Sequence, residues 1–342
     1  MSDRLATPGS AGRRTGRRRR GGGAERSMVP EAEFTSYYGR PIVKPSPWEA
    51  DIPAYLFAGG LAAGSSLIAA GADLTGRPAL RRTSRLAALG ALGFSMGALV
   101  RDLGKPSRFT NMLRTAKLTS PMSVGTWILS TYGPFAGAAA AAEAISLLPA
   151  ARNGSGPLAL ASTLGRPAGV MAGLTAPPVA AYTAVLLADT ATPSWHAAYK
   201  ELPFVFVGSA AAAAAGLGLI GAPPSETGPV RRLAAAGAAL ELAMEARMER
   251  SMGITAEPLH QGRAGRLMRA SRVLTAAGAV GAVLAGRSRA AAAASGLALL
   301  AGSVCTRFGI FEAGQESAKD PKYTVVPQRE RLQREGPVRY QP

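Results

Sequence analysis

The sequence has few of the side chains that hold metals and prosthetic groups. Of its 342 residues, one is a cysteine and two are histidines. Cys305 excludes a disulfide within the chain, and it falls short of the about four thiolates that hold an iron–sulfur cluster. A membrane cytochrome that holds two haems by paired histidines needs four of them, so His196 and His260 are too few. The composition thus excludes redox centres of these kinds from this chain.

Aromatic residues are also scarce, at 6%, and the 47% of hydrophobic residues consists mostly of alanine, leucine and valine. The mean hydropathy is only +0.11, because basic tails and loops dilute a series of apolar runs. Each run has about 20 residues, the length that crosses roughly 30 Å of hydrocarbon as a helix. These runs are apolar all round, without the charged outer face of a soluble amphipathic helix. The chain is therefore predicted to be an all-α integral membrane protein.

Eight runs are expected to be transmembrane helices, at about 52–72, 86–100, 122–148, 168–188, 204–221, 230–248, 271–285 and 290–311. They lie in a predicted membrane domain at 37–311, between a basic N-terminal tail at 1–36 and a basic C-terminal tail at 312–342. Pro177 and Pro178 are expected to bend or break the fourth helix.

A weak internal repeat indicates two parallel units of four helices. Ile52-Pro53 opens the first helix and Leu202-Pro203 opens the fifth, at an offset of 150 residues, and repeats of this kind are common in membrane proteins. Chance similarity between two helices rich in alanine and glycine is the alternative.

The net charge of +18 does not indicate a nucleic-acid partner, because the basic residues lie in tails and inter-helix loops. Membrane proteins that face anionic lipid have this distribution. The arginine run at 13–20 lacks the apolar segment of a twin-arginine signal, so the N-terminus is either a basic tail or translation starts at Met28. Counting lysine and arginine places both termini in the cytoplasm, although most of the excess comes from the tails.

A long polar loop, RDLGKPSRFTNMLRTAKLTS, connects the second and third predicted helices. Loops of more than about 12 residues are usually functional or disordered, so this loop is expected either to be held by a partner or to line a site. Arg101, Asp102, Arg108 and Arg114 are predicted to dock a partner subunit, with local salt bridges as the alternative.

This loop and the following PMSVGTW resemble the NrfD/polysulfide-reductase family of membrane subunits, as do IPAYLFAGGLAAGS, YTAVLLADTATPSWHAAYKELPF and FGIFEAGQESAKDPKYTVVPQRER. The resemblance implies a haem-free anchor in the cell membrane, with eight helices in two four-helix bundles. It also implies electron exchange between a quinone, expected to be menaquinone, and a four-cluster ferredoxin-like iron–sulfur subunit that serves a molybdopterin catalytic subunit. Apart from a quinone site, the anchor would have no catalytic centre, and no metal is expected in it.

The resemblance also indicates quinone-contacting residues. Tyr55 stands where polysulfide-reductase-like members have a histidine, so a donor is kept and the imidazole base is lost. Tyr182 matches a quinone-contacting tyrosine of that family, allowing one residue of slippage. An ordinary core tyrosine is the alternative for Tyr182.

Four further residues are candidates because of their position at the same membrane face. Glu49 and Asp51, at the start of the first helix, could take the proton of a quinol or act as dipole partners of the helix N-terminus. Trp195 is either a quinone contact or an anchor in the aromatic belt. His196 is a candidate because histidine titrates near neutral pH.

Acidic residues within the apolar runs need partners, since a charge in lipid is costly and usually pairs or lines a pathway. Glu143, Asp189, Glu241 and Glu245 are therefore candidates for a proton path. Alternatively, Glu241 and Glu245 reach water near a helix end or pair with arginines. Two other functions stay open, namely a secondary transporter, because of these acids and the proline pair, and a passive docking anchor without quinone chemistry.

Overall fold

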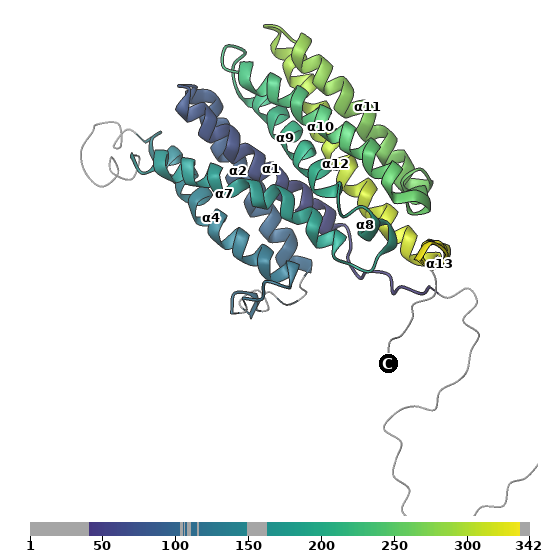
Figure 1. Ribbon diagram of the computed structural model, residues 1–342. Helices are drawn as coiled ribbons and strands as arrows, with labels where there is room; N and C mark the ends of the chain where they lie inside the picture. Colours follow the sequence, from purple (N-terminus) through teal and green to yellow (C-terminus); the bar gives the residue numbers. More distant parts are fainter. Residues whose placement is uncertain are drawn as a thin grey trace, which may run out of the picture. The chain divides into compact units, whose positions relative to one another are not determined.

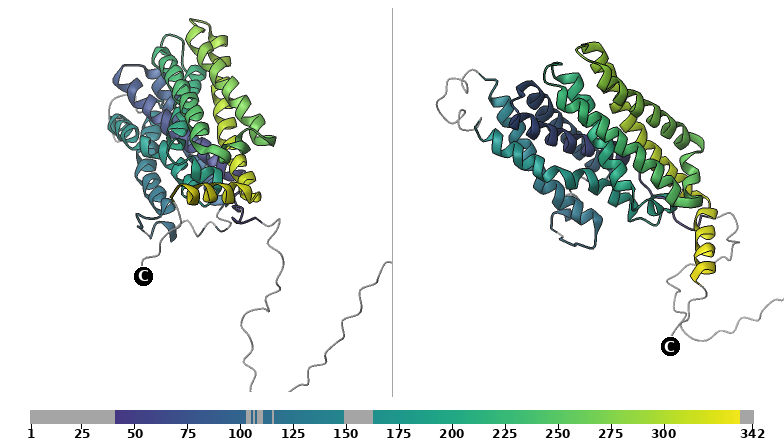
Figure 2. Two further views of the ribbon diagram at one scale, coloured as in Figure 1. Left: turned by 45° about the vertical axis from the view of Figure 1, so that its right-hand side comes forward. Right: turned by 45° about the horizontal axis from the view of Figure 1, so that its top comes forward.

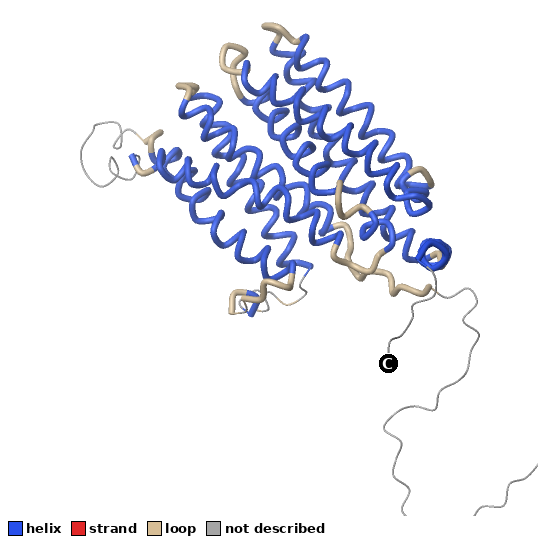
Figure 3. Tube along the Cα trace, viewed as in Figure 1, coloured by secondary structure: helices blue, strands red, loops and turns tan. Residues whose placement is uncertain are grey.

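The computed structural model describes residues 41–335 apart from 103–104, 106, 108–110, 115 and 149–162, and the described residues form helices and no strand (Figure 3). Eight of these helices have 20 residues or more and run side by side (Figures 1 and 2). They are α1 (Asp51–Leu74), α2 (Pro78–Asp102), α4 (Pro121–Ile145), α7 (Gly165–Ala188), α9 (Leu202–Gly221), α10 (Gly228–Met252), α11 (Gly262–Leu284) and α12 (Arg289–Lys319). The shorter helices are α8 (Pro193–Ala197), the 3₁₀ helix η1 (Gly253–Leu259) and α13 (Lys322–Glu335).

Six of the long helices, α1, α2, α7, α9, α11 and α12, are long and apolar enough to cross a membrane. The prediction of an all-helical, multi-pass membrane protein is thereby confirmed. Helices α4 and α10 are not among the six; α10 carries three glutamates as well as arginines near both of its ends. The predicted N-terminal tail at 1–36 lies outside the described residues.

Proline sets the start of several helices. Pro121 stands at the N-terminus of α4, where the Ser120 side chain accepts a hydrogen bond from the Ser123 backbone N–H. Proline suits the first turn because its missing N–H would have no partner there. Pro177 and Pro178 are different, since they lie inside α7, and yet α7 continues as one helix. Its packing against α1 and α4 supports the helix where the prolines remove hydrogen bonds, so of the two expected outcomes, a bend or a break, the break does not occur.

Several helices extend beyond the apolar runs that predict them. Helix α2 begins at Pro78 rather than near 86, α11 begins at Gly262 rather than near 271, and α12 continues to Lys319 rather than 311. The segment predicted as a C-terminal tail also contains α13. Hydropathy marks only the part of a helix that is apolar, whereas arginine and glutamate are good helix formers and extend it beyond the apolar part.

Helices α1 and α9 pack against each other, and between them they pack against α2, α7, α10, α11 and α12. Small residues make their contact close, because a Cβ on Gly64 would lie 2.7 Å from the Ala214 Cβ and one on Gly60 would lie 3.2 Å from the Ala210 Cβ. Residues of this size at four-residue spacing allow helices to approach closely in lipid. The core thus lies along the contact between α1 and α9.

One end of the long helices carries most of the additional structure. Here α8 contacts α7, α10 and α12, and η1 contacts α13 (Figures 1 and 2). Residues 41–50 also lie at this end, where Gln315 Nε2 donates hydrogen bonds to the carbonyl oxygens of Ser46 (3.1 Å) and Trp48 (3.0 Å). We call it the α8 end; α1 and α4 begin there, and α2 and α7 end there.

Candidate functional site

A narrow cavity of about 40 Å³ lies at the α8 end, enclosed by the start of α1, the end of α2, the start of α4 and the end of α7. Its polar groups come from Tyr55, Asp102, Thr126 and Tyr182. The remaining lining is Trp48, Ile52, Leu99, Met112, Met122, Gly125, Leu129 and Leu186. The structure thus brings together Tyr55 and Tyr182, the two tyrosines that the sequence singled out.

The two tyrosines come from different helices, α1 and α7, and both line the cavity. Tyr55 is 2% exposed and Tyr182 is 7% exposed. The Tyr182 ring lies directly against Gly125 of α4, since a Cβ there would be only 1.7 Å from the Tyr182 Cζ. The glycine therefore makes the room that lets Tyr182 reach Tyr55.

Asp102 is half-buried and is the one carboxylate among the residues that line the cavity. The sequence assigned Asp102 to partner docking. Asp51 is engaged by Arg101, whose Nε donates to the Asp51 Oδ2 at 2.8 Å, and Glu49 is exposed. Among the three acids at this mouth, Asp102 is the one that lines the same cavity as Tyr55 and Tyr182.

Trp195 and His196 do not line the cavity. Trp195 is 1% exposed, and its Nε1 donates to the Ile310 carbonyl at 2.9 Å. It stacks on Trp48 with a centroid distance of 5.9 Å, so it supports the cavity wall from behind rather than anchoring in an aromatic belt. His196 is exposed, with Nδ1 3.1 Å from the Ala188 carbonyl oxygen.

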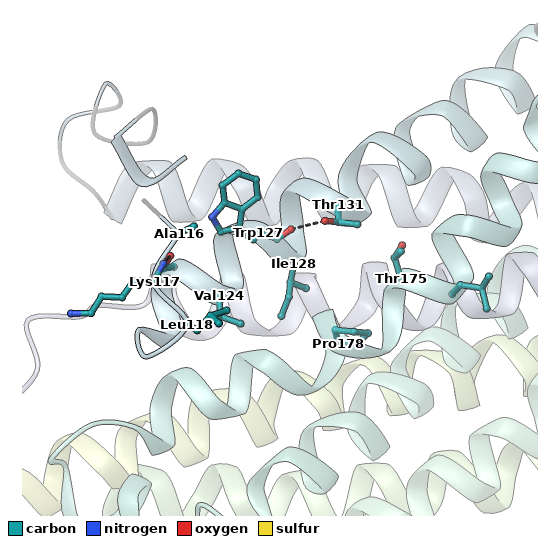
Figure 4. A pocket seen from close by; sticks show the side chains of 11 residues that line it. Ala116, Lys117, Leu118, Val124, Trp127, Ile128, Thr131, Thr175 and Pro178 are labelled. Carbon is teal, nitrogen blue, oxygen red and sulfur yellow. Dashed lines mark hydrogen bonds between the residues drawn. The ribbon is translucent and has the colours of Figure 1, made fainter. Parts of the chain in front are cut away.

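Two larger hollows adjoin the cavity. One, of about 280 Å³, shares Met112, Met122 and Thr126 with it. The other is an apolar groove of about 450 Å³ between α4 and α7, and it shares Ser123 with the first hollow. Figure 4 shows Trp127, Ile128 and Thr131 of α4 and Thr175 and Pro178 of α7 along this groove. The three spaces form a series from the helix surface to the tyrosine pair.

The predicted docking residues fall at or near the α8 end, as far as they are described. Arg101 is 77% exposed on its side chain although it pairs with Asp51, and Arg114 is exposed. Arg108 lies outside the described residues. Lys105 and Lys117 are also exposed, so the described part of this segment presents a basic surface.

The four intramembrane acids fall in three separate places. Glu143 is at the opposite end, where Arg81 Nε and Arg85 Nη1 each lie 3.0 Å from its Oε2. Both arginines also pair with Asp73 at 3.2 Å, so Glu143 belongs to a charge cluster that joins α1, α2 and α4. Asp189 is exposed just after α7.

Glu241 and Glu245 are each 1% exposed on α10. Thr306 Oγ1 donates to the Glu241 Oε1 at 2.6 Å, and Arg272 Nε donates to the Glu245 Oε1 at 2.7 Å. The pairing with arginine that the sequence left open is therefore present at Glu245. In the part of the chain that is described, no three of the residues His, Cys, Asp and Glu form a group that could hold a metal ion.

Six helices long and apolar enough to cross a membrane define a multi-pass membrane protein. Its buried polar site lies at one end of the long helices. Residues 42–222, more than half of the chain, match the family described as "Polysulphide reductase, NrfD". The chain belongs to this family, which confirms the resemblance read from its motifs. Family membership indicates a membrane subunit of a redox complex that partners with oxidoreductase subunits. No curated protein matches the chain.

Proposed function

We propose that the chain is the quinone-reactive membrane anchor of its redox complex, passing electrons between menaquinone and an iron–sulfur subunit that serves a molybdopterin catalytic subunit. One observation carries the proposal: Tyr55, Tyr182 and Asp102, from three helices, meet at one cavity at the α8 end. In this proposal all eight long helices cross the cell membrane, in two groups of four, α1 to α7 and α9 to α12.

The residues around the cavity suit quinone chemistry. A quinol gives up two protons and two electrons, and its two oxygens need hydrogen-bond partners throughout. A tyrosine hydroxyl both donates and accepts, so Tyr55 and Tyr182 can orient the head group, and the Asp102 carboxylate can accept a proton. The electrons pass to an iron–sulfur cluster of the partner subunit. The basic surface around Arg101 and Lys117 provides a docking site for this subunit, which would present an acidic surface there.

The size of the spaces decides where the head group binds. At about 40 Å³, the cavity is far smaller than ligand pockets, which have about 300–1,000 Å³. The adjoining hollow of about 280 Å³ is separated from it by Met112 and Met122, and methionine side chains repack readily. We therefore expect the two methionines to move aside, so that the head group occupies both spaces and the apolar tail lies in the groove of Figure 4.

The test is quinol-linked electron transfer by the purified complex. Tyr55→Phe and Tyr182→Phe each remove one hydroxyl, so quinol oxidation falls while the activity of the catalytic subunit with an artificial dye is unchanged. Tyr199→Phe is the matched control, because Tyr199 is 55% exposed and outside the cavity. Unchanged quinol kinetics in both cavity variants would remove the site assignment.

A secondary transporter remains the second candidate, since the fully buried Glu241 and Arg307 are of the kind found in ion pathways. Ligand uptake into proteoliposomes that contain only this chain would favour transport. A purified complex that retains no quinone would instead favour a passive docking anchor.

A further inference from the structure

A buried polar cluster lies among α9, α10, α11 and α12, away from the tyrosine cavity. Glu241, near the middle of α10, accepts from Thr306, and the Thr306 hydroxyl is 2.6 Å from the Ser271 hydroxyl. Ser209 Oγ donates to the Ser303 Oγ at 2.8 Å. We call the following residues the Glu241 cluster: Ser209, Glu241, Ser271, Thr275, Ser303, Thr306 and Arg307. These residues lie on α9 to α12, whereas the helices that line the tyrosine cavity are α1, α2, α4 and α7.

Several atoms of this cluster have no hydrogen-bond partner among the residues that the structure describes. Arg307 is fully buried; its Nη2 donates to the Phe206 carbonyl at 2.9 Å, and its guanidinium lies 3.7 Å from the Phe206 ring centroid. Within the described residues, no partner is found for Arg307 Nε and Nη1, Glu241 Oε2 and Thr275 Oγ1. Buried groups of this kind are costly when unpaired, and internal water usually satisfies them.

A file of charged groups leads from the cluster to the α8 end. Glu245 follows Glu241 by one helical turn, and Arg272 of α11 contacts both Glu245, at 2.7 Å, and Glu249. The Glu249 Oε2 lies 3.8 Å from Nε2 of His260, whose side chain is 51% exposed. Residues four apart on a helix lie on one face, so the three glutamates form a single row that ends in water.

The opposite direction is closed. Beyond Thr275, the four helices pack through small and apolar residues that include Ala234, Ala282 and Leu299. A Cβ on Gly278 would lie 2.8 Å from the Leu299 Cγ, which shows how tightly this part is packed. The polar file is therefore open at one end only.

We propose that this file is a one-sided proton-access path, in which Glu241 takes up and releases a proton that reaches it from the α8 end along the Glu249–Glu245 row, with internal water between Glu241 and Arg307. A proton from water converts the Glu241 carboxylate into the neutral acid, and the reverse step returns it. The other charged groups facing this row are Arg307 from α12, Arg272 from α11 and His260 after η1.

This path includes only two of the four acids that the sequence suggests for a proton route, Glu241 and Glu245. Glu143 is held by arginines at the opposite end, and Asp189 is exposed after α7; neither belongs to the file. Helices α11 and α12 lie outside the residues that match the family. The proposal does not depend on quinone binding, so either can fail alone.

The test is infrared spectroscopy of the full-length protein in detergent, transferred from H₂O to D₂O. A protonated carboxyl has its own C=O stretching band, which shifts when deuterium replaces the proton. We expect such a band, its loss in Glu241→Gln, and its retention in the matched control Glu316→Gln, whose side chain is 56% exposed.

Glu245→Gln should keep the Glu241 band and slow its exchange by about tenfold or more, which corresponds to about 1.4 kcal/mol in the barrier. A structural role alone would not change this rate. If Glu241→Gln does not fold, Thr306→Val tests the same band, because loss of the hydroxyl donor should shift its frequency. The proposal is overturned if no Glu241 band is seen at any pH at which the protein stays folded, if Thr306→Val leaves the band in place, or if Glu245→Gln exchanges at the wild-type rate.

Discussion

The position of Tyr182 depends on the missing side chain of Gly125. In Gly125→Ala, the new Cβ would lie 1.7 Å from the Tyr182 Cζ, whereas carbon atoms in contact are about 3.5–4.0 Å apart. The ring must therefore move by about 2 Å. A shift of this size separates the Tyr182 hydroxyl from whatever it binds in the cavity.

The consequences can be estimated separately for stability and for binding. Overpacking lowers the free energy of unfolding by roughly 1–3 kcal/mol. The higher helix propensity of alanine offsets up to about 1 kcal/mol of this loss. A lost hydrogen bond costs about 0.5–1.5 kcal/mol, so quinone affinity should fall by roughly 2- to 12-fold. The net loss of stability is small, and the two effects can be measured on folded protein.

Gly137→Ala is the matched control, because Gly137 lies on the same helix and a Cβ there would meet nothing within 4 Å. Thermal unfolding in detergent and titration with a short-chain menaquinone analogue are measured for both variants. Gly137→Ala should bind quinone like the wild type. If Gly125→Ala also binds quinone with wild-type affinity, the placement of Tyr182 against Gly125 has no part in the site.

Three further predictions concern the packing, the ion pairs and pH. Gly64→Leu should destabilise the protein by roughly 1–3 kcal/mol in thermal unfolding, and Gly71→Leu should not, because a Cβ on Gly71 would meet nothing within 4 Å. Glu143→Gln should cost up to about 3–5 kcal/mol, since Arg81 and Arg85 lose the buried carboxylate that they share and keep only their pairing with Asp73; a fully stable variant would show that the Glu143 carboxylate contributes nothing. The hydrogen bond from Lys322 holds the pKa of Glu257 below its usual value. Because the folded pKa is lowered, the ionised Glu257 stabilises its contact with α13 fully above the ordinary value of 4.5, and this stabilisation is lost as the pH falls through the folded pKa. The protection of α13 amides against hydrogen exchange should therefore be lower at a pH below the folded pKa than at a pH above 4.5. Equal protection at these two pH values would contradict the prediction.

Periodicity and hydropathy predicted the class of fold because each apolar run of about 20 residues is itself the signal of a helix in lipid. The same signal misplaced the start of α2. A start near 86 leaves Arg81 and Arg85 outside the predicted helix, whereas both lie on α2 and pair with Glu143. Hydropathy does not show that a charged residue belongs to a helix when the acid that pairs with it is distant in the sequence. Glu143, the partner of Arg81, is 62 residues away.

The candidate site was predictable in part. The family resemblance pointed to Tyr55 and Tyr182, but no sequence pattern shows that Gly125 makes room for Tyr182 or that Trp48 stacks on Trp195. These contacts depend on the rotation of each helix about its axis. Asp102 was assigned to docking for the same reason, since a residue at a helix end can face either the partner or the cavity.

The most direct test of the quinone site uses the chain's own tryptophans. Trp48 lines the cavity and Trp127 lines the groove, so a bound quinone should quench both. Titration of the purified full-length protein in detergent with a short-chain menaquinone analogue should give saturable quenching. Tyr182→Phe should weaken the affinity by roughly 2- to 12-fold, whereas Tyr199→Phe should leave it unchanged. Quenching that never saturates, or that is the same in both variants, would contradict the assignment of the tyrosine cavity as a quinone site.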